Sequence, residues 1–327
     1  MKKFRISIIF GLMLISSILK AQTIKTESTP NQMVDALHNT FGKHPNARAV
    51  HAKGIIVEGY FEASEKAKAI TKAIQFQNKK TPVTVRFSDF TGIPNIPDTI
   101  GASNPRGLAI KFLLPKGVTT DIVTHSYNGF PVSNTDEFVE LLNAIAKSGA
   151  NAQKPTALEQ FFGTHPIAKT FLTTQKPATT SFGTISYYGV NSYKFTNVKG
   201  ESKFIRYQFI PEDGEQFLNK EQIAKSSPDY LYDEIKNHLK NKPVKFKLYA
   251  QIAKTEDNIA NPSIAWPETR ERILLGTITI TKIGKNTPDA DKQLHFIPNN
   301  VTEGIETADP MLEDRSKAYP ISIKERQ

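Results

Sequence analysis

The segment that decides the fold is "TPVTVRFSDF" (81–90), which is followed by "GLAIKFLLP" (107–115). In both segments apolar side chains recur at every second position, with polar or small residues between them. This period of two is typical of a β-strand that buries one of its faces. The two segments therefore predict two successive strands.

The rest of the chain mixes strands and helices irregularly. The segment "TISYYGVNSYKFTNVKGESKFIRYQFIP" (184–211) is typical of a strand, a turn at "VKGE" and a second strand. Further strands are expected at 49–64, 243–254 and 273–283, helices at 30–42, 64–77, 135–149, 226–239 and 308–319, and a polar segment that wraps the surface at 150–180. Because a β–α–β rhythm is missing, we predict an α+β fold built on a curved antiparallel sheet or barrel, surrounded by helices.

Residues 1–21 have the pattern of a secretory signal peptide. "MKKFR" (1–5) is cationic, "ISIIFGLMLISSIL" (6–19) is an apolar run, and Ala21 is a small residue at the expected cleavage site. A membrane span needs about 20 apolar residues, so the run is short for a signal anchor, which is the alternative. We expect an exported, periplasmic protein whose mature chain, 22–327, is a single domain without a membrane span.

Composition excludes some classes of chemistry and partner. The chain contains no cysteine, which excludes disulfides, thiol nucleophiles and thiolate metal ligands. Its formal net charge is +10, and part of this excess belongs to the cationic start of the signal peptide. A mild positive excess spread over a long chain suits solubility or an anionic ligand, and we expect no nucleic-acid partner.

Three segments together resemble the haem catalase family: "RAVHAKG" (48–54), "VRFSDFTG…NPRGLAIKF" (85–112) and "DPMLEDRSKAY" (309–319). Weaker similarities fill the gaps in the same order, at 188–209, 261–267 and 294–306. The resemblance implies a catalase-like antiparallel β-barrel and haem b as the cofactor. It is to the short branch of catalase-related peroxidases, because the chain ends eight residues after Tyr319 and lacks the long C-terminal extension of typical catalases.

The resemblance assigns the axial ligand of the haem iron to Tyr319. A free tyrosine has a pKa near 10, so a neutral phenol needs help to bind as the phenolate. Arg315 lies one helical turn earlier on the same face and can donate a hydrogen bond to that oxygen. Without the family context, an arginine and a tyrosine four residues apart would only indicate an ordinary helix surface.

His51 matches the distal histidine of the family. An imidazole with a pKa near 6.5 can take a proton from one oxygen of a peroxide and return it to the other. Ser88, in "VRFS", resembles the serine that hydrogen-bonds this histidine and sets its tautomer. The alternatives are a structural histidine and a serine that faces solvent.

A second polar group should orient the peroxide on the distal side. We predict Asn128, in "DIVTHSYNGFPV" (121–132), because its amide can donate a hydrogen bond; Ser126 is the alternative. This segment departs from the family pattern. His125 lies in the same segment, which should border the pocket.

Haem carries two propionates, and burying them requires cations. Arg48, Arg86 and Arg326 are the candidates for this role. Arg326 lies seven residues after Tyr319, as in the family, and a charge at a frayed chain end is the alternative for it. Phe138 is expected to line the pocket, with ordinary core packing as the alternative.

The predicted function is therefore that of a haem peroxidase. It would reduce organic hydroperoxides, and hydrogen peroxide as well, through a ferryl intermediate and with electrons from an unidentified reductant. The alternatives are a catalase that dismutates hydrogen peroxide, an isomerase of fatty-acid hydroperoxides and an exported haem-binding protein without turnover. The oligomeric state stays open, with a homodimer among the options.

Overall fold

The computed structural model describes residues 27–77 and 80–327. The predicted signal peptide lies outside the described residues. Among those residues, no helix is long and apolar enough to cross a membrane.

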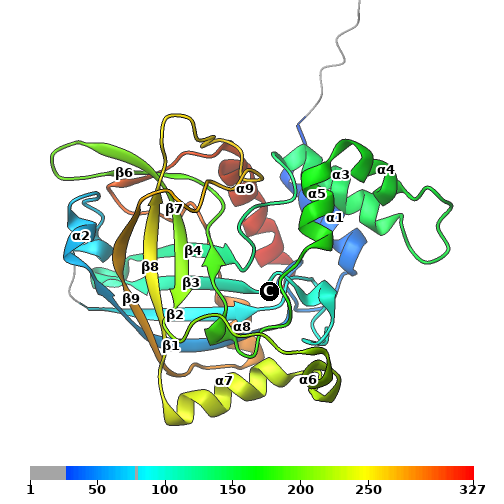
Figure 1. The fold of residues 1–327 in the computed structure, drawn as a ribbon, viewed down its shortest axis with the longest axis horizontal. Coiled ribbons are helices and arrows are strands. Elements are labelled where there is room, and N and C mark those ends of the chain that lie inside the picture. The colour runs from blue at the N-terminus through cyan, green and yellow to red at the C-terminus, as the bar shows by residue number, and fades with distance from the viewer. Residues whose placement is uncertain (1–26, 78–79) are drawn as a thin grey trace, which may run out of the picture.

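The centre of the molecule is a closed antiparallel barrel (Figure 1). The strands are β1 (Gly54–Ala63), β2 (Thr81–Ser88), β3 (Gly107–Leu113), β4 (Thr119–His125), β5 (Tyr187–Tyr188), β6 (Tyr193–Thr196), β7 (Ser202–Pro211), β8 (Val244–Ile252), β9 (Arg272–Ile283) and β10 (Ile305–Thr307). They follow the order β10-β6-β7-β5-β4-β3-β2-β1-β9-β8, and β7 also pairs with β8. This last pairing closes eight strands into a barrel, so the predicted fold class is confirmed.

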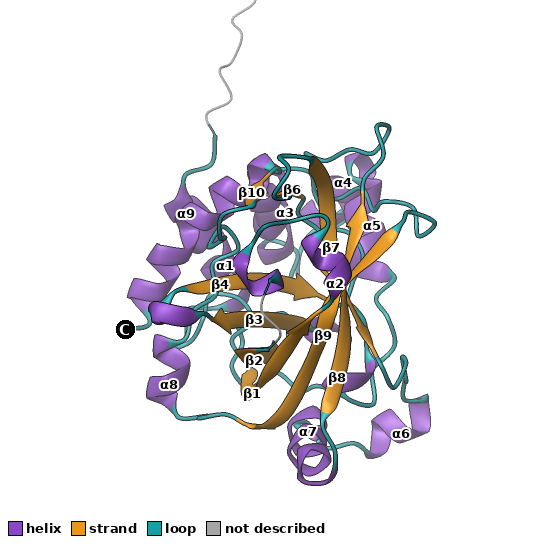
Figure 2. Cartoon of the chain, turned by 90° about the vertical axis from the view of Figure 1, so that its left-hand side faces the viewer, coloured by secondary structure: helices purple, strands orange, loops and turns teal. Residues whose placement is uncertain are grey.

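Helices cover two parts of this barrel. The α-helices are α1 (Pro30–Phe41), α2 (Glu65–Lys68), α3 (Thr135–Ala146), α4 (Ala157–Thr164), α5 (Pro166–Thr173), α6 (Lys220–Lys225), α7 (Tyr230–Asn241), α8 (Pro288–Gln293) and α9 (Pro310–Glu325). In Figure 1, α1, α3, α4 and α5 form a lobe beside the barrel, with α9 between the two. In Figure 2, α6 and α7 lie below the strands, and α8 and α9 lie on one side.

The alternating pattern of β2 and β3 separates two environments. Val85 and Phe87 on β2 belong to the apolar core inside the barrel, together with Leu108 on β3. The residues between them, Arg86 and Ser88, face the opposite side, where α9 lies. The outer face of these strands is therefore the one that carries polar chemistry.

The structure differs from the predicted elements in three places. In place of the helix expected at 64–77, the structure has α2 and a short 3₁₀ helix at Ile74–Phe76, because the chain between them bonds elsewhere: Lys72 N–H donates to the Thr196 carbonyl. The polar segment 150–180, for which no helix was predicted, contains α4 and α5. The last helix begins at Pro310 and continues past Pro320 to Glu325.

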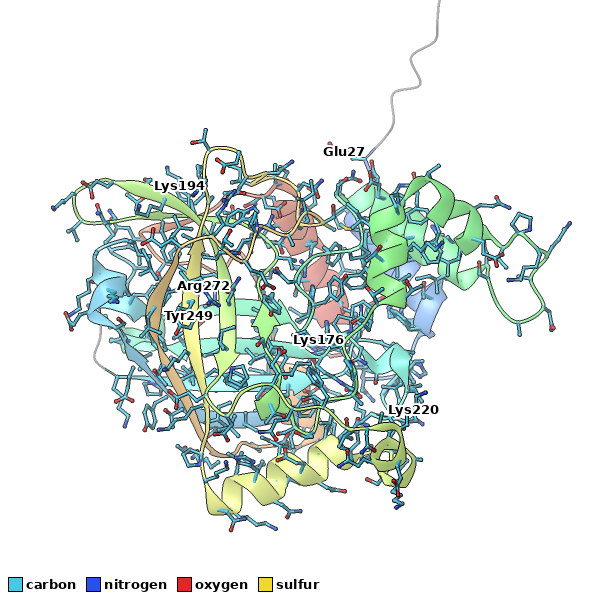
Figure 3. All side chains as sticks on the ribbon, viewed as in Figure 1. Glu27, Lys176, Lys194, Lys220, Tyr249 and Arg272 are labelled. Carbon is cyan, nitrogen blue, oxygen red and sulfur yellow. The ribbon has the colours of Figure 1, made fainter. Side chains whose placement is uncertain are left out.

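Charged side chains are spread widely over the surface. Figure 3 labels Lys176, Lys194 and Lys220, which lie on different parts of the molecule. On the outside of the barrel, the Arg272 guanidinium lies 5.6 Å from the centre of the Tyr249 ring. The net positive charge of the chain is therefore shared among separate elements.

Candidate active site

A cavity lies between the outer face of β2–β4 and helix α9. Several elements that are distant in the sequence contribute to it: the segment before β1, the strands themselves, α1, α3 and α9. Its lining includes Arg48, Val50, His51, Arg86, Ser88, Phe90, Gly107, Ala109, Val123, His125, Phe130, Phe138, Val190, Asn191, His295, Arg315, Tyr319 and Arg326. Most of the residues predicted for the site are thereby brought together.

Strand register builds the sheet side of the cavity. Ser88 on β2 pairs with Gly107 on β3, and Gly107 pairs with His125 on β4. A Cβ atom at position 107 would lie 2.4 Å from Ser88 Oγ and 2.8 Å from His51 Nδ1. Only a glycine leaves room there for the imidazole of His51 against the sheet.

His51 occupies the segment before β1 in a strained backbone conformation, with φ of 56°. Such left-handed conformations are uncommon for residues other than glycine and concentrate at functional sites. Its Nδ1 lies 2.9 Å from the carbonyl oxygen of Asp89 and 3.0 Å from Ser88 Oγ. Because a carbonyl can only accept, Nδ1 carries the proton, and Nε2 is left with its lone pair.

The charge state of His51 follows from its surroundings. Burial lowers the pKa of His51 to about 3, and the nearby positive charge of Arg86 adds to the effect. The imidazole is therefore neutral at neutral pH. Its Nε2 is a hydrogen-bond acceptor that can receive a proton.

Arg86 fixes the backbone that carries this histidine. Its guanidinium donates to the carbonyl oxygens of His51, at 2.8 Å, and Ala52, at 3.0 Å. A Cβ atom at Gly54 would lie 2.2 Å from the Arg86 guanidinium, so a larger residue there would displace the guanidinium from these carbonyls. Arg86 thus has a positioning role that the sequence analysis did not assign.

Behind His51 lies a buried ionic network. Asp89, whose carbonyl holds the imidazole, forms a fully buried ion pair with Arg106. Lys53 Nζ donates to Asp98 Oδ1 at 2.5 Å in the same network. Burial raises the pKa of Asp89, with the neighbouring Asp98 acting in the same direction. This network holds the Asp89 carbonyl rigidly against the distal histidine.

Helix α9 supplies the other side of the cavity. Arg315 Nη2 lies 3.3 Å from the Tyr319 hydroxyl oxygen, and Arg315 Nη1 donates to Asn191 Oδ1 at 2.9 Å. Asn191 Nδ2 in turn donates to Asp309 Oδ2 at 2.7 Å. Asp309 is also the N-cap of α9. A continuous chain of hydrogen bonds therefore runs from the start of the helix to the phenol.

Positive charge gathers at one edge of the cavity. Arg48 and Arg86 both form ion pairs with Asp291 on α8. Although burial opposes it, the charges of Arg86 and Arg48 lower the pKa of the Asp291 carboxyl. Arg326 is only 4% exposed, and its Nε has no hydrogen-bond partner within the described chain. Three arginines against one carboxylate leave an excess of two positive charges, which matches two propionates.

Asn128 does not line the cavity, and neither does its alternative Ser126. Strand β4 ends at His125, and the chain then bends away from the sheet face over residues 126–129. Ser126 is buried, and its Oγ accepts the N–H of Arg106 at 2.9 Å. Two polar residues of the segment 121–132 line the cavity, Thr124 and His125, and the hydroxyl of Thr124 already donates to the Leu108 carbonyl oxygen. Phe138 does line it, with its ring 5.4 Å from that of Phe130.

The sequence analysis missed three residues that complete the site. Asp309 and Asn191 lie inside segments quoted for the family resemblance, so both were available as signals. Asp291 gave no signal, because it lies 205 residues from its partner Arg86.

The lining residues fit a haem group. Aromatic and aliphatic side chains cover much of the cavity, as a flat apolar macrocycle requires, and the arginines gather at one edge where propionates need cations. Tyr319 offers an oxygen ligand for iron from the helix, while His51 presents an imidazole from the sheet. The unpartnered Nε of Arg326 and Nε2 of His125 are the buried donors that a bound group would satisfy.

Comparison with known proteins agrees with this geometry. The model of the Catalase family matches residues 30–327. Two similar relatives are named catalase-related peroxidase: one from Mycolicibacterium paratuberculosis is 34% identical over 91% of this chain and 95% of its own, and one from Synechococcus elongatus is 31% identical over 92% and 89%. Catalase A from Saccharomyces cerevisiae superposes with a TM-score of 0.76 at 22% identity, over 87% of this chain but 62% of its own.

Proposed function

This chain belongs to the catalase family, and from that premise we propose that it is a haem-dependent peroxidase that reduces organic hydroperoxides. Family membership and the two relatives named catalase-related peroxidase support an oxidoreductase that acts on peroxides. The choice of organic hydroperoxides as substrates and their reduction as the reaction are our own proposal. We place the protein outside the cytoplasm, on the strength of the signal-like residues 1–21.

One observation carries the proposal: His51 and Tyr319 line the same cavity from different elements. The neutral His51 offers a bare Nε2 to a bound peroxide. Tyr319, with Arg315 beside its oxygen, offers a ligand to iron. A carrier that only holds haem has no need of a positioned base, so the arrangement favours turnover.

Haem, when bound, would supply the redox centre at which the O–O bond is broken. His51 Nε2 would accept the proton of ROOH and return it to the departing oxygen. The overall reaction consumes two electrons and two protons and yields ROH and water. The electrons would come from an external reductant. Arg86 keeps His51 in place through its backbone carbonyl.

The lining of the cavity supports the preference for organic peroxides. Phe90, Phe130 and Phe138 all contribute aromatic surface to the cavity, and the ring of Phe90 lies 5.6 Å from that of His51. Such surface stabilises an alkyl or aryl substituent by burying it, at roughly 25 cal/mol per Å², and gives no advantage to hydrogen peroxide.

Steady-state rates on the haem-loaded protein test this function. Cumene hydroperoxide and hydrogen peroxide are each offered with and without a phenolic reductant, and protein loaded with zinc protoporphyrin is the control. A peroxidase consumes cumene hydroperoxide only with the reductant. Oxygen release from hydrogen peroxide without the reductant would indicate a catalase instead. Haem uptake without any peroxide consumption would indicate a carrier.

A further inference from the structure

The sheet side of the cavity carries a second imidazole that the proposed chemistry does not use. His125 ends β4, and its register partner on β3 is Gly107, over which the ring of His51 lies. Directly paired residues on neighbouring strands have Cβ atoms about 4.5–5.5 Å apart. His125 is therefore one strand away from the distal histidine, on the same face of the sheet.

The hydrogen bonds of His125 determine its tautomer. The backbone N–H of Tyr127 donates to His125 Nδ1 at 3.3 Å. Since Nδ1 accepts, the single proton of the neutral ring is on Nε2. This is the reverse of His51, whose Nδ1 is protonated and whose Nε2 is bare. The two imidazoles therefore offer one acceptor and one donor.

The donor of His125 has nothing to bind. Its Nε2 is buried and makes no hydrogen bond with any residue in 27–77 or 80–327. The rings of Phe130 and Phe171 lie 6.4 and 6.1 Å from it, centre to centre, and they supply no oxygen or nitrogen acceptor. An unpaired buried donor destabilises the fold, and such groups in folded proteins are usually satisfied by a ligand or water.

The charge of His125 agrees with this role. Burial lowers the pKa of His125 to about 3, and the neighbouring His51 and Arg315 act in the same direction. The ring therefore stays neutral and keeps one N–H across the working pH range. A neutral donor adds no repulsion toward Arg315.

We propose that the Nε2–H of His125 is the hydrogen-bond donor that orients the peroxide so that Nε2 of His51 receives its proton. The proposal rests on the peroxidase function. A hydroperoxide has one proton to give and oxygen lone pairs that accept, so it matches one bare nitrogen and one N–H. His125 thereby takes the role that the sequence analysis gave to Asn128.

Cyanide is a suitable probe, because hydrogen cyanide gives up its proton on binding and the bound anion accepts a hydrogen bond. The dissociation constant for cyanide and kcat/KM for cumene hydroperoxide are measured on haem-loaded His125→Gln and His125→Met. These two side chains have the same length, but only glutamine keeps an N–H. His165→Leu, which changes a histidine outside the cavity lining, is the control.

We expect His125→Met to weaken cyanide binding and lower kcat/KM roughly 10-fold or more, the effect of losing one good hydrogen bond. His125→Gln should stay much closer to the wild type, and His165→Leu should match it. Equal values for His125→Gln and His125→Met would overturn the proposal, because the donor would then be irrelevant. Melting of the haem-free variants checks that both fold. A wild type that takes up no haem would instead refute the peroxidase function itself.

Discussion

The two sides of the cavity are built by opposite means. On the sheet side, burial keeps His51 and His125 uncharged, with a pKa of about 3 for each. On the helix side, Arg315 and the carboxylate of Asp309 are linked by hydrogen bonds to the phenol of Tyr319. Neutral imidazoles suit proton transfer, whereas a charged chain suits the holding of an iron ligand.

The difference also concerns how each side is assembled. The helix side comes almost entirely from one contiguous segment, residues 309–319, which includes the N-cap of α9. The sheet side needs His51, Ser88, Gly107 and His125 to meet through strand register and a strained backbone. Changes to the helix side should therefore alter haem binding, while changes to the sheet side should alter turnover.

The largest effect is expected for Tyr319→Phe. This change removes the phenol oxygen that α9 offers to iron. Loss of outer-shell groups typically costs 10–100-fold in metal affinity, so loss of the ligand itself should cost more than about 100-fold. A haem titration followed by the Soret absorption measures it. Tyr249→Phe, on the outside of the barrel, is the control. Wild-type haem affinity in Tyr319→Phe would show that α9 does not supply the iron ligand through this residue.

His51→Leu should leave haem uptake intact and abolish most of the turnover. General acid–base catalysis is typically worth about 10²–10⁴-fold. Stopped-flow mixing of the haem-loaded variant with cumene hydroperoxide gives the rate of the first spectral change. A loss of less than about 10-fold would mean that His51 is not the base.

Gly107→Ala tests whether the register of the sheet positions His51. The new methyl group would lie 2.8 Å from His51 Nδ1, so the ring must move. A displacement of about 1 Å at a catalytic group can cost about 100-fold, and we expect kcat/KM to fall by up to that factor with haem affinity unchanged. Gly101→Ala is the matched control, since nothing lies within 4 Å of its Cβ position. Equal activity in the two variants would break the link between register and turnover.

Arg315→Leu should have a smaller effect on the helix side. Hydrogen bonds to charged groups are worth about 1.5–3 kcal/mol. The 3.3 Å distance to the Tyr319 oxygen favours the low end, or roughly a 10-fold loss of haem affinity. Without the guanidinium the phenolate becomes a stronger electron donor, so the Fe(III)/Fe(II) midpoint potential should fall. If both quantities match the wild type, Arg315 does not act on the ligand.

The last prediction concerns the dependence of folding stability on pH. His51 and His125 have a folded-state pKa of about 3 against about 6.5 in the unfolded chain. Below pH 6.5 the unfolded state therefore binds protons that the folded state does not, and stability falls as the pH drops toward 3. The melting temperature of the haem-free protein should decline between pH 7 and 4. A His51→Leu, His125→Leu double variant should decline less, and identical slopes would contradict the neutral state of these rings.

The sequence predicted most of the barrel because the period-two segments at 81–90 and 107–115 carry a strong local signal. It overestimated the helix at 64–77, where Lys72 N–H bonds to Thr196 instead of continuing a helix. It also missed α4, although Thr156 and Glu159 form a capping box there. Local patterns predict an element well only where tertiary contacts do not compete.

The site was predictable to a different extent on its two sides. Arg315 and Tyr319 were predicted from the family resemblance of one contiguous segment, 309–319, because their spacing alone would only indicate an ordinary helix surface. The choice between Asn128 and Ser126 left out His125, because the residue at which β4 ends decides which side chain of this segment faces the cavity. The pairing of Arg86 with Asp291 joins residues 205 positions apart, so no local pattern could indicate it.

A haem titration of four variants tests most directly whether the helix side of the cavity binds haem while the sheet side serves turnover. His51→Leu and His125→Met change the sheet side, whereas Arg315→Leu and Tyr319→Phe change the helix side. We predict that the first pair binds haem as tightly as the wild type, and that the second pair binds it progressively more weakly. Equal losses of haem affinity in both pairs would contradict this prediction, because haem binding would then depend on the sheet-side histidines as much as on the helix side.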